Sequence, residues 1–301
     1  MYELRFPNLG IVLKNVIDGF FIGDFEIRFY GIVIALGFVL GYLAIAGEAK
    51  RTGQDPELYL DYMLWLVIPA ILGARIYYVV FRLQDYVRQG QSVRDTVMGM
   101  LNIRGGGLAI YGGVIAGILT LIVFARKRGV SVLLMLDTCV MGLLTGQILG
   151  RWGNFFNREA FGAYTDSLFA MAIPVEWFGG KNYLLRTVNN GIITQDMIDH
   201  VLTIEGREFI QVHPTFLYES LWNLGVLLVI FLYRRHKKFD GEMFAMYIWG
   251  YGLGRVWIEA LRTDSLMILG GNFKVSQLLA ALCVVGASIY MIYKRIQLKK
   301  A

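Results

Sequence analysis

The sequence of 301 residues is 56% hydrophobic and only 17% charged, with a mean hydropathy of +0.53 and a formal net charge of +6. Soluble globular proteins carry about 25% charged residues, so this composition excludes an ordinary soluble domain. Apolar stretches of about 20 residues recur along the chain, and each is long enough to cross about 30 Å of hydrocarbon. The basic residues cluster beside these stretches, which is typical of membrane topology signals and argues against a nucleic-acid partner. We therefore expect an all-α polytopic membrane protein embedded in the lipid bilayer.

The apolar segments predict about seven transmembrane helices within a single transmembrane domain over residues 1–301. In chain order they are 28–47, 59–81, 107–125, 131–149, 215–233, 242–261 and 274–293. Lysine and arginine are dense in every second connection, namely Lys50-Arg51, Arg126-Lys127-Arg128, Arg234-Arg235 with Lys237-Lys238, and the C-terminal tail. The positive-inside rule places these connections in the cytoplasm. We expect the N-terminus outside and the C-terminus inside.

Two segments on the outer side are too long to be simple turns. Residues 82–106 include Val87–Leu101, an amphipathic stretch that we expect to lie along the membrane interface. Residues 151–213 are longer and more polar. They predict a small extracytoplasmic head of mixed structure, inserted between the fourth and fifth spans.

Ionisable side chains are costly inside a bilayer, so each one within a span is a functional hypothesis. In this chain they include Arg75, Asp137, Glu219, Arg255 and Glu259. All of these except Asp137 fall in the outer half of the membrane. Asp137 lies near the cytoplasmic end of its span, where it can pair with the basic loop at 126–128. Arg75 is alone on its span, and either packs or snorkels as a structural residue or belongs to a site.

The sixth span carries a polar stripe. Tyr251, Arg255, Glu259 and Arg262 are spaced i, i+4, i+8 and i+11, which puts them on one helix face. Two interpretations remain open. Arg255 and Glu259 form a structural ion pair, or the carboxylate holds the arginine in place for a ligand.

The sequence lacks the common catalytic motifs. It has no phosphate-binding loop, no nucleophile elbow and only three widely spaced histidines, so we expect no metal and no cofactor. Arginine binds phosphate through planar, charge-assisted hydrogen bonds. The residues therefore indicate an outer-leaflet site for an anionic phospholipid headgroup. They do not decide between chemistry on the lipid and an outer-leaflet phospholipid transporter or flippase.

A long motif follows the fourth predicted span. Residues 150–162 read GRWGNFFNREAFG, which resembles the signature GRxGNFxNxExxG of the prolipoprotein diacylglyceryl transferase family at every fixed position. Other segments resemble further motifs of this family in the same order: Phe29-Tyr30-Gly31, Gly73-Ala74-Arg75, His213-Pro214 with Leu217-Tyr218-Glu219, and Tyr251-Gly252-Leu253-Gly254-Arg255. The resemblance extends over nearly the whole chain.

The resemblance implies a reaction in the bacterial cytoplasmic (inner) membrane. The family moves the diacylglyceryl group of phosphatidylglycerol to the lipobox cysteine of a prolipoprotein signal peptide, which forms a thioether and releases glycerol phosphate. By resemblance, the catalytic candidates are Arg151, Asn154, Glu159, Tyr111, Arg255 and His213. The candidates for headgroup binding are Arg151, Arg255, Tyr30, Asn157, Glu259 and Tyr251.

The third span departs from the family pattern. Many family members carry histidine before the Gly-Gly of this span, where this chain has Tyr111 after the glycine run 105–107. A neutral tyrosine with a pKa of about 10 is a poor base at pH 7. Tyr111 is activated by an arginine, or it only positions the headgroup, or another group accepts the proton. We expect positioning, with His213 and Glu159 as the alternative proton acceptors.

Overall fold

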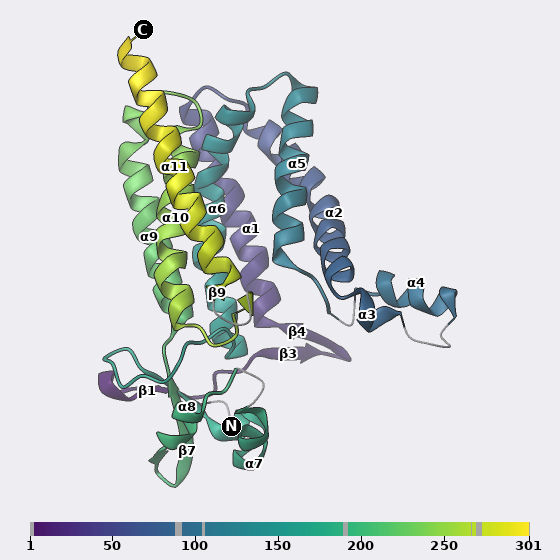
Figure 1. Ribbon diagram of the computed structural model, residues 1–301, viewed down its shortest axis with the longest axis vertical. Coiled ribbons are helices and arrows are strands. Elements are labelled where there is room, and N and C mark those ends of the chain that lie inside the picture. Colours follow the sequence, from purple (N-terminus) through teal and green to yellow (C-terminus); the bar gives the residue numbers. More distant parts are fainter. Residues whose placement is uncertain are drawn as a thin grey trace. The chain divides into compact units, whose positions relative to one another are not determined.

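The computed structural model describes residues 3–87, 92–103, 106–188, 192–265, 267–268 and 273–300. Its long helices are α1 (Phe29–Arg51), α2 (Pro56–Phe81), α5 (Ile110–Arg128), α6 (Val132–Asn157), α9 (Thr215–Tyr233), α10 (Glu242–Leu261) and α11 (Val275–Lys300) (Figure 1). The short helices are α3 (Leu83–Tyr86), α4 (Val93–Leu101), α7 (Lys181–Thr187) and α8 (Gln195–Asp199). Each predicted span corresponds to one long helix.

Six of the long helices are apolar and long enough to cross a membrane, whereas α10 is not among them. Helix α10 has 20 residues but carries three charged side chains, at Glu242, Arg255 and Glu259. The described residues therefore support a polytopic membrane protein with six candidate spans. The prediction of a seventh span rests on α10 alone.

The residues divide into two compact units. One contains Ile45–Cys139, and the other contains Met1–Ala44 together with Val140–Ala301. In the first unit α2 packs closely on α5, because a side-chain Cβ at Gly112 would lie only 2.2 Å from the carbonyl oxygen of Gly73. Such close approach at small residues is typical of helices in membranes.

An apolar stripe runs along one face of α2. It consists of side chains spaced four residues apart that are 55–68% exposed in the isolated chain: Leu64, Ile68, Leu72, Ile76 and Val80. In water such a stripe would promote aggregation, whereas in a bilayer it can face the lipid tails.

The larger unit holds a five-stranded antiparallel sheet with the order β2-β1-β5-β7-β6. Its strands are β1 (Leu4–Phe6), β2 (Ile11–Leu13), β5 (Met171–Pro174), β6 (Leu202–Ile204) and β7 (Arg207–Val212). The central pairing places Ile173 opposite Ile210, and both side chains are fully buried. The first two strands come from the N-terminal segment, which the sequence did not assign to the head.

Two short hairpins precede membrane helices. Strands β3 (Gly19–Ile22) and β4 (Phe25–Arg28) lead directly into α1, and Figure 1 shows them extending sideways from its first turn. Strands β8 (Met267–Ile268) and β9 (Phe273–Lys274) lead into α11.

Two predicted boundaries differ from the structure. The fourth span was predicted to end at 149, but α6 continues to Asn157. The polar residues of the signature ended the apolar pattern without ending the helix. The amphipathic stretch at Val87–Leu101 is represented by α4, whereas residues 88–91 lie outside the described part of the chain.

Candidate functional site

The final turns of α6 and the turn that follows carry the motif at 150–162. The helix ends at Asn157, and the chain then reverses through Arg158 and Ala160, whose φ angles of 50° and 56° are unusual for residues other than glycine. A backbone conformation of this kind persists only where the surroundings hold it.

Backbone hydrogen bonds supply that restraint. The amide of Gly162 donates to the carbonyl of His213 at 2.9 Å, and the amide of His213 donates to Ala163 at 3.0 Å. The amide of Ala163 donates to Leu261 at 2.8 Å, at the end of α10. The motif is thereby fastened both to the start of α9 and to the end of α10.

Arg158, the second arginine of this motif, has a structural role. Its side chain is 2% exposed, its guanidinium lies 4.0 Å from the ring centroid of Trp177, and it donates to the carbonyls of Phe156 and Val16. It therefore fixes the end of α6 to the segment that follows β2.

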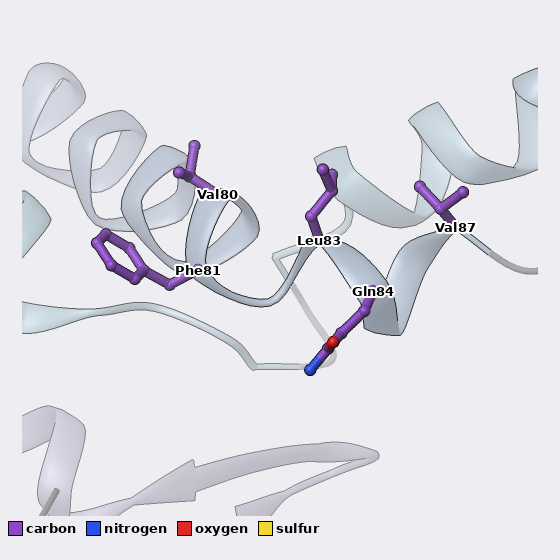
Figure 2. A pocket seen from close by; sticks show the side chains of 5 residues that line it. All are labelled: Val80, Phe81, Leu83, Gln84 and Val87. Carbon is purple, nitrogen blue, oxygen red and sulfur yellow. The ribbon is translucent and has the colours of Figure 1, made fainter. Parts of the chain in front are cut away.

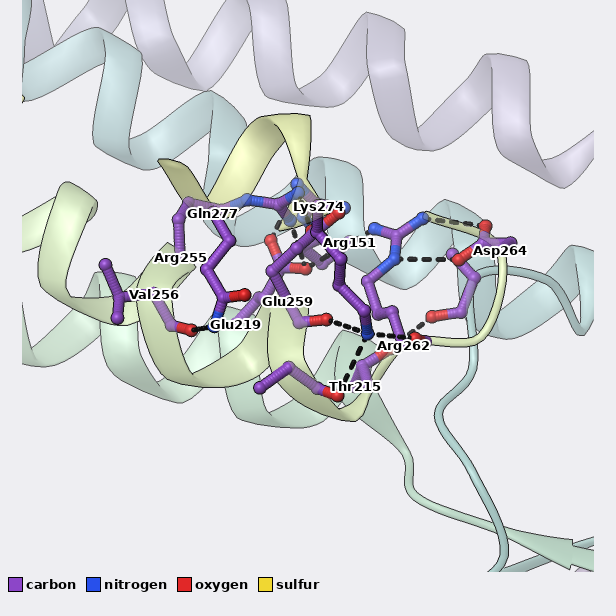
Figure 3. A network of polar contacts seen from close by, with 12 residues as sticks. Arg151, Thr215, Glu219, Arg255, Val256, Glu259, Arg262, Asp264, Lys274 and Gln277 are labelled. Atoms are coloured by element: carbon purple, nitrogen blue, oxygen red, sulfur yellow. Dashed lines mark hydrogen bonds and ion pairs between the residues drawn. The ribbon is translucent and has the colours of Figure 1, made fainter. Parts of the chain in front are cut away.

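A buried carboxylate on α9 gathers the arginines of three segments. Oxygen Oε2 of Glu219 lies 2.7 Å from Arg151 Nη2, and its Oε1 accepts a hydrogen bond of 2.9 Å from Arg255 Nη1 (Figure 3). Arg262 Nη1 is 3.7 Å from the same Oε1. The Glu219 side chain is only 3% exposed, so these pairs are little screened by solvent.

Two further carboxylates complete this arginine network. Arg255 pairs with Glu259, one turn along α10, and Arg262 forms a bidentate pair with Asp264 at 2.9 and 2.8 Å. The structural ion pair predicted between Arg255 and Glu259 is therefore present. It leaves the second interpretation open, because the same contact also holds the guanidinium in place.

Lys274 neutralises the end of α10. Its Nζ donates to the carbonyls of Glu259 at 2.8 Å, Ala260 at 3.0 Å and Arg262 at 2.6 Å. A cation at this position hydrogen-bonds carbonyls at the end of the helix and opposes the helix dipole. On α11, Gln277 donates to Val256 at 2.8 Å.

The charges in this network do not cancel. Among the described residues it contains four cations, Arg151, Arg255, Arg262 and Lys274, and three carboxylates, Glu219, Glu259 and Asp264. The formal surplus is one positive charge. The Arg151 side chain is 22% exposed, against 13% for Arg255 and 15% for Arg262. Arg151 is thus the most exposed of these three guanidinium groups.

A second polar cluster follows Arg151 on α6. The carboxylate of Glu159 accepts hydrogen bonds from the amide nitrogens of Asn154 at 2.9 Å and Asn157 at 3.3 Å. Tyr30 lies against the same helix, because a Cβ at Gly153 would be 2.6 Å from its ring. The structure therefore brings these four candidates to the last two turns of α6.

Comparison with known proteins identifies the family. The family model described as prolipoprotein diacylglyceryl transferase matches residues 19–293. The chain belongs to this family.

Three curated relatives carry the name phosphatidylglycerol–prolipoprotein diacylglyceryl transferase. The protein of Limosilactobacillus reuteri (strain DSM 20016) is 39% identical over 275 residues, which are 91% of this chain and 89% of the relative. That of Clostridioides difficile (strain 630) is 37% identical over 89% of this chain and 91% of its own. That of Halalkalibacterium halodurans is 35% identical over 91% of this chain and 84% of its own.

His213, in the family's HPxxLYE motif, lies just before α9. Burial lowers the pKa of its imidazole below the ordinary value of 6.5, so the ring is neutral at pH 7. Its Nδ1 is 3.3 Å from the hydroxyl of Tyr218. A neutral imidazole has one acceptor nitrogen, which is what a proton acceptor requires.

The remaining candidates lie elsewhere in the fold. Tyr251 is one turn before Arg255 on α10 and stacks on Tyr247 at a centroid distance of 5.7 Å. Tyr111 belongs to the unit Ile45–Cys139, where it is the second residue of α5 and its ring lies 6.2 Å from that of Tyr77.

We do not assign the headgroup site to one surface hollow of this chain. It opens where α2 meets α3, and it is lined by Val80, Phe81, Leu83, Gln84 and Val87 (Figure 2). None of these five described side chains is charged, so they cannot neutralise a phosphate. Among the described residues, no group of three or more histidine, cysteine, aspartate or glutamate side chains could hold a metal ion.

Sequence reasoning identified the arginines but not how they are held together. It noted Glu219 as an ionisable residue in a span, whereas the structure makes its carboxylate the centre of the arginine network. Lys274 was missed entirely. Neither role follows from spacing along one helix, because the partners come from α6, α9, α10 and β9.

Proposed function

We propose that this protein transfers the diacylglyceryl group of phosphatidylglycerol to the lipobox cysteine of exported prolipoproteins. The cysteine sulfur attacks the glycerol carbon that is bonded to the phosphate oxygen. A C–S bond forms, the C–O bond breaks, and glycerol phosphate leaves with the electron pair. The thiol proton passes to a base or to solvent. The observation that supports this proposal is the arginine network. It includes an arginine of the family signature and has a formal surplus of one positive charge.

The network suits the charge change of the reaction. A phosphodiester has one negative charge, and the departing phosphomonoester gains a second as the bond breaks. Donors that are already oriented toward developing charge stabilise the transition state more than the ground state. Arg151 binds the phosphate directly and Arg255 is the second guanidinium, while Glu219 and Glu259 hold the two arginines in position.

The other candidates have distinct roles in this proposal. Asn154, Asn157 and Glu159 form a hydrogen-bonded group that orients the substrate, and Tyr30 covers the same helix. His213 is neutral and is the proton acceptor that we favour among the described residues. Tyr111 contributes a phenol hydroxyl that positions the headgroup, and Tyr251 lines the deeper side of Arg255.

We also propose that α10 is the seventh span. Its 20 residues extend about 30 Å, which is the thickness of the hydrocarbon layer. It packs between the apolar helices α9 and α11 (Figure 1), and its outer charges are paired, which lowers their cost in the membrane. The sheet and residues 151–213 then form the extracytoplasmic head of an inner-membrane protein whose C-terminal end is cytoplasmic.

The direct test uses purified protein in phosphatidylglycerol nanodiscs with a synthetic lipobox peptide. Mass spectrometry should show a diacylglyceryl adduct on the cysteine and none on a peptide with serine at that position. Movement of labelled lipid between leaflets without any adduct would instead identify a flippase and refute the transferase.

A further inference from the structure

Arg75 is the one intramembrane arginine of the sequence analysis that lies in the unit Ile45–Cys139. It is only 7% exposed, so it does not snorkel to the membrane surface. Its Nε donates to the carbonyl of Met100 at 2.7 Å and its Nη2 to that of Gly99 at 2.8 Å. Its Nη1 donates to both Gly106 and Gly107, each at 2.8 Å.

These bonds occupy most of the guanidinium. Arginine has five N–H groups, and the four bonds to carbonyl oxygens leave one of them. The rings of Tyr78 and Tyr86 lie 5.8 and 5.5 Å from the guanidinium carbon. Arg75 therefore cannot grip a phosphate through two parallel hydrogen bonds, as a headgroup ligand would.

The bonded carbonyls belong to two segments that the arginine joins. Gly99 and Met100 are in the last turn of α4, where a cation opposes the helix dipole. Gly106 and Gly107 precede α5, whose second residue is Tyr111. One side chain of α2 thus binds both ends of the connection that leads to Tyr111.

Gly107 supplies independent support. Its φ angle is +80°, and a Cβ at this position would lie 2.5 Å from Arg75 Nη1 and 2.8 Å from the ring of Tyr78. Any side chain would therefore displace the guanidinium or the ring. The next anchor is close by, since the amide of Ala109 donates to the carbonyl of Ala74 at 3.0 Å. The close contact of the arginine with this segment therefore requires a glycine at position 107.

We propose that Arg75 is a positioning residue for the transferase reaction: with Gly107 it fixes the segment 106–109 and so places the hydroxyl of Tyr111. It acts through Tyr111 and does not touch the phospholipid. The role in catalysis rests on the proposed function, whereas the contact itself does not. The two parts can therefore be tested separately.

The first experiment measures backbone hydrogen exchange in lipid nanodiscs and needs no activity. In Arg75→Gln and in Gly107→Ala, amides of residues 106–112 should exchange faster than in the wild type. Arg82→Gln is the matched control, because Arg82 is 60% exposed and forms a long ion pair of 3.5 Å with Asp85. Unchanged exchange at 106–112 in both variants would overturn the proposed contact, whether or not the wild type transfers lipid.

The second experiment measures transfer kinetics. Because Arg75 acts through the Tyr111 hydroxyl, kcat in Arg75→Gln and Gly107→Ala should fall about as far as loss of that hydroxyl would lower it, about two- to tenfold. The Michaelis constant for phosphatidylglycerol should stay near the wild-type value, and Arg82→Gln should be unaffected. Adding Tyr111→Phe to either variant should lower kcat by less than about twofold, because the hydroxyl is already misplaced.

Two results would refute the positioning role. One is a full, independent loss from Tyr111→Phe in the Arg75→Gln background. The other is a raised Michaelis constant with normal kcat that Arg75→Lys restores, because that pattern belongs to a direct charge contact with the lipid. If Arg75→Gln fails to fold, Gly107→Ala carries both tests alone.

Discussion

Replacing Glu219 with glutamine removes the charge at the centre of the arginine network while keeping the shape of the side chain. The carboxylate is 3% exposed and lies 2.7 Å from Arg151 and 2.9 Å from Arg255. Loss of one partner of a buried ion pair typically costs about 3–5 kcal/mol. We expect Glu219→Gln to lower the free energy of unfolding by an amount in that range.

The expected effects of Glu219→Gln on substrate affinity and on kcat differ. Without Glu219 the site gains positive potential, so the affinity for an anionic headgroup should not fall. The arginines lose their orientation, however, and a misplacement of about 1 Å can cost on the order of 10²-fold in rate. We therefore expect kcat to fall by about that factor while the Michaelis constant for phosphatidylglycerol does not rise.

The assay is steady-state transfer to a lipobox peptide, with thermal unfolding measured on the same preparations. Glu176→Gln is the control, because Glu176 pairs with Arg207 at 2.8 Å but is 49% exposed. An exposed pair contributes only about 0–1 kcal/mol, so this variant should behave like the wild type. Turnover within about twofold of the wild type in Glu219→Gln would show that the carboxylate does not organise the site.

Three further predictions concern the headgroup site and the topology. Arg151→Ala should abolish transfer and Arg151→Lys should restore little of it, because a point charge replaces a planar fork of donors; near-normal turnover in the alanine variant would remove Arg151 from the site. Tyr111→Phe should slow transfer about two- to tenfold, the cost of about 0.5–1.5 kcal/mol for one neutral hydrogen bond, whereas a loss of about 10²–10⁴-fold would indicate a general base. Reporter fusions in the loop 234–241 should report a cytoplasmic location, and an external signal there would reverse the proposed topology.

The transmembrane part of the fold could be predicted well because bilayer thickness sets the length of each apolar segment. The first predicted span, 28–47, corresponds to the helix Phe29–Arg51, and the second, 59–81, corresponds to the helix Pro56–Phe81. The prediction of 131–149 was wrong at its C-terminal end, where α6 continues to Asn157. Polar side chains at the membrane surface are compatible with a helix, so hydropathy cannot locate that end.

The sheet was harder to predict than the helices. Strand β1 has three residues, and it pairs with β5, where Arg5 lies opposite Ala172. Such short strands give almost no periodic signal, and no local pattern links segments so far apart in sequence. The N-terminal contribution to the sheet was missed for this reason.

Some contacts of the candidate site could likewise be predicted from the sequence, and others could not. Arg255 and Glu259 share one helix, so their spacing predicted the contact that the structure contains. Glu219 and Lys274 act across elements, and only the folded chain brings them to the arginines. Hydrogen bonds to backbone carbonyls, such as those of Arg75, are likewise invisible in a sequence because the acceptor is common to every residue.

We infer that the arginine network drives the departure of glycerol phosphate from phosphatidylglycerol as the cysteine is alkylated. The most direct measurement follows phosphatidylglycerol with a labelled headgroup and counts released glycerol phosphate against modified peptide. The wild type should release one headgroup per thioether formed, and Arg151→Ala should give neither product. Release of headgroup without thioether, or equal yields from Arg151→Ala, would contradict it.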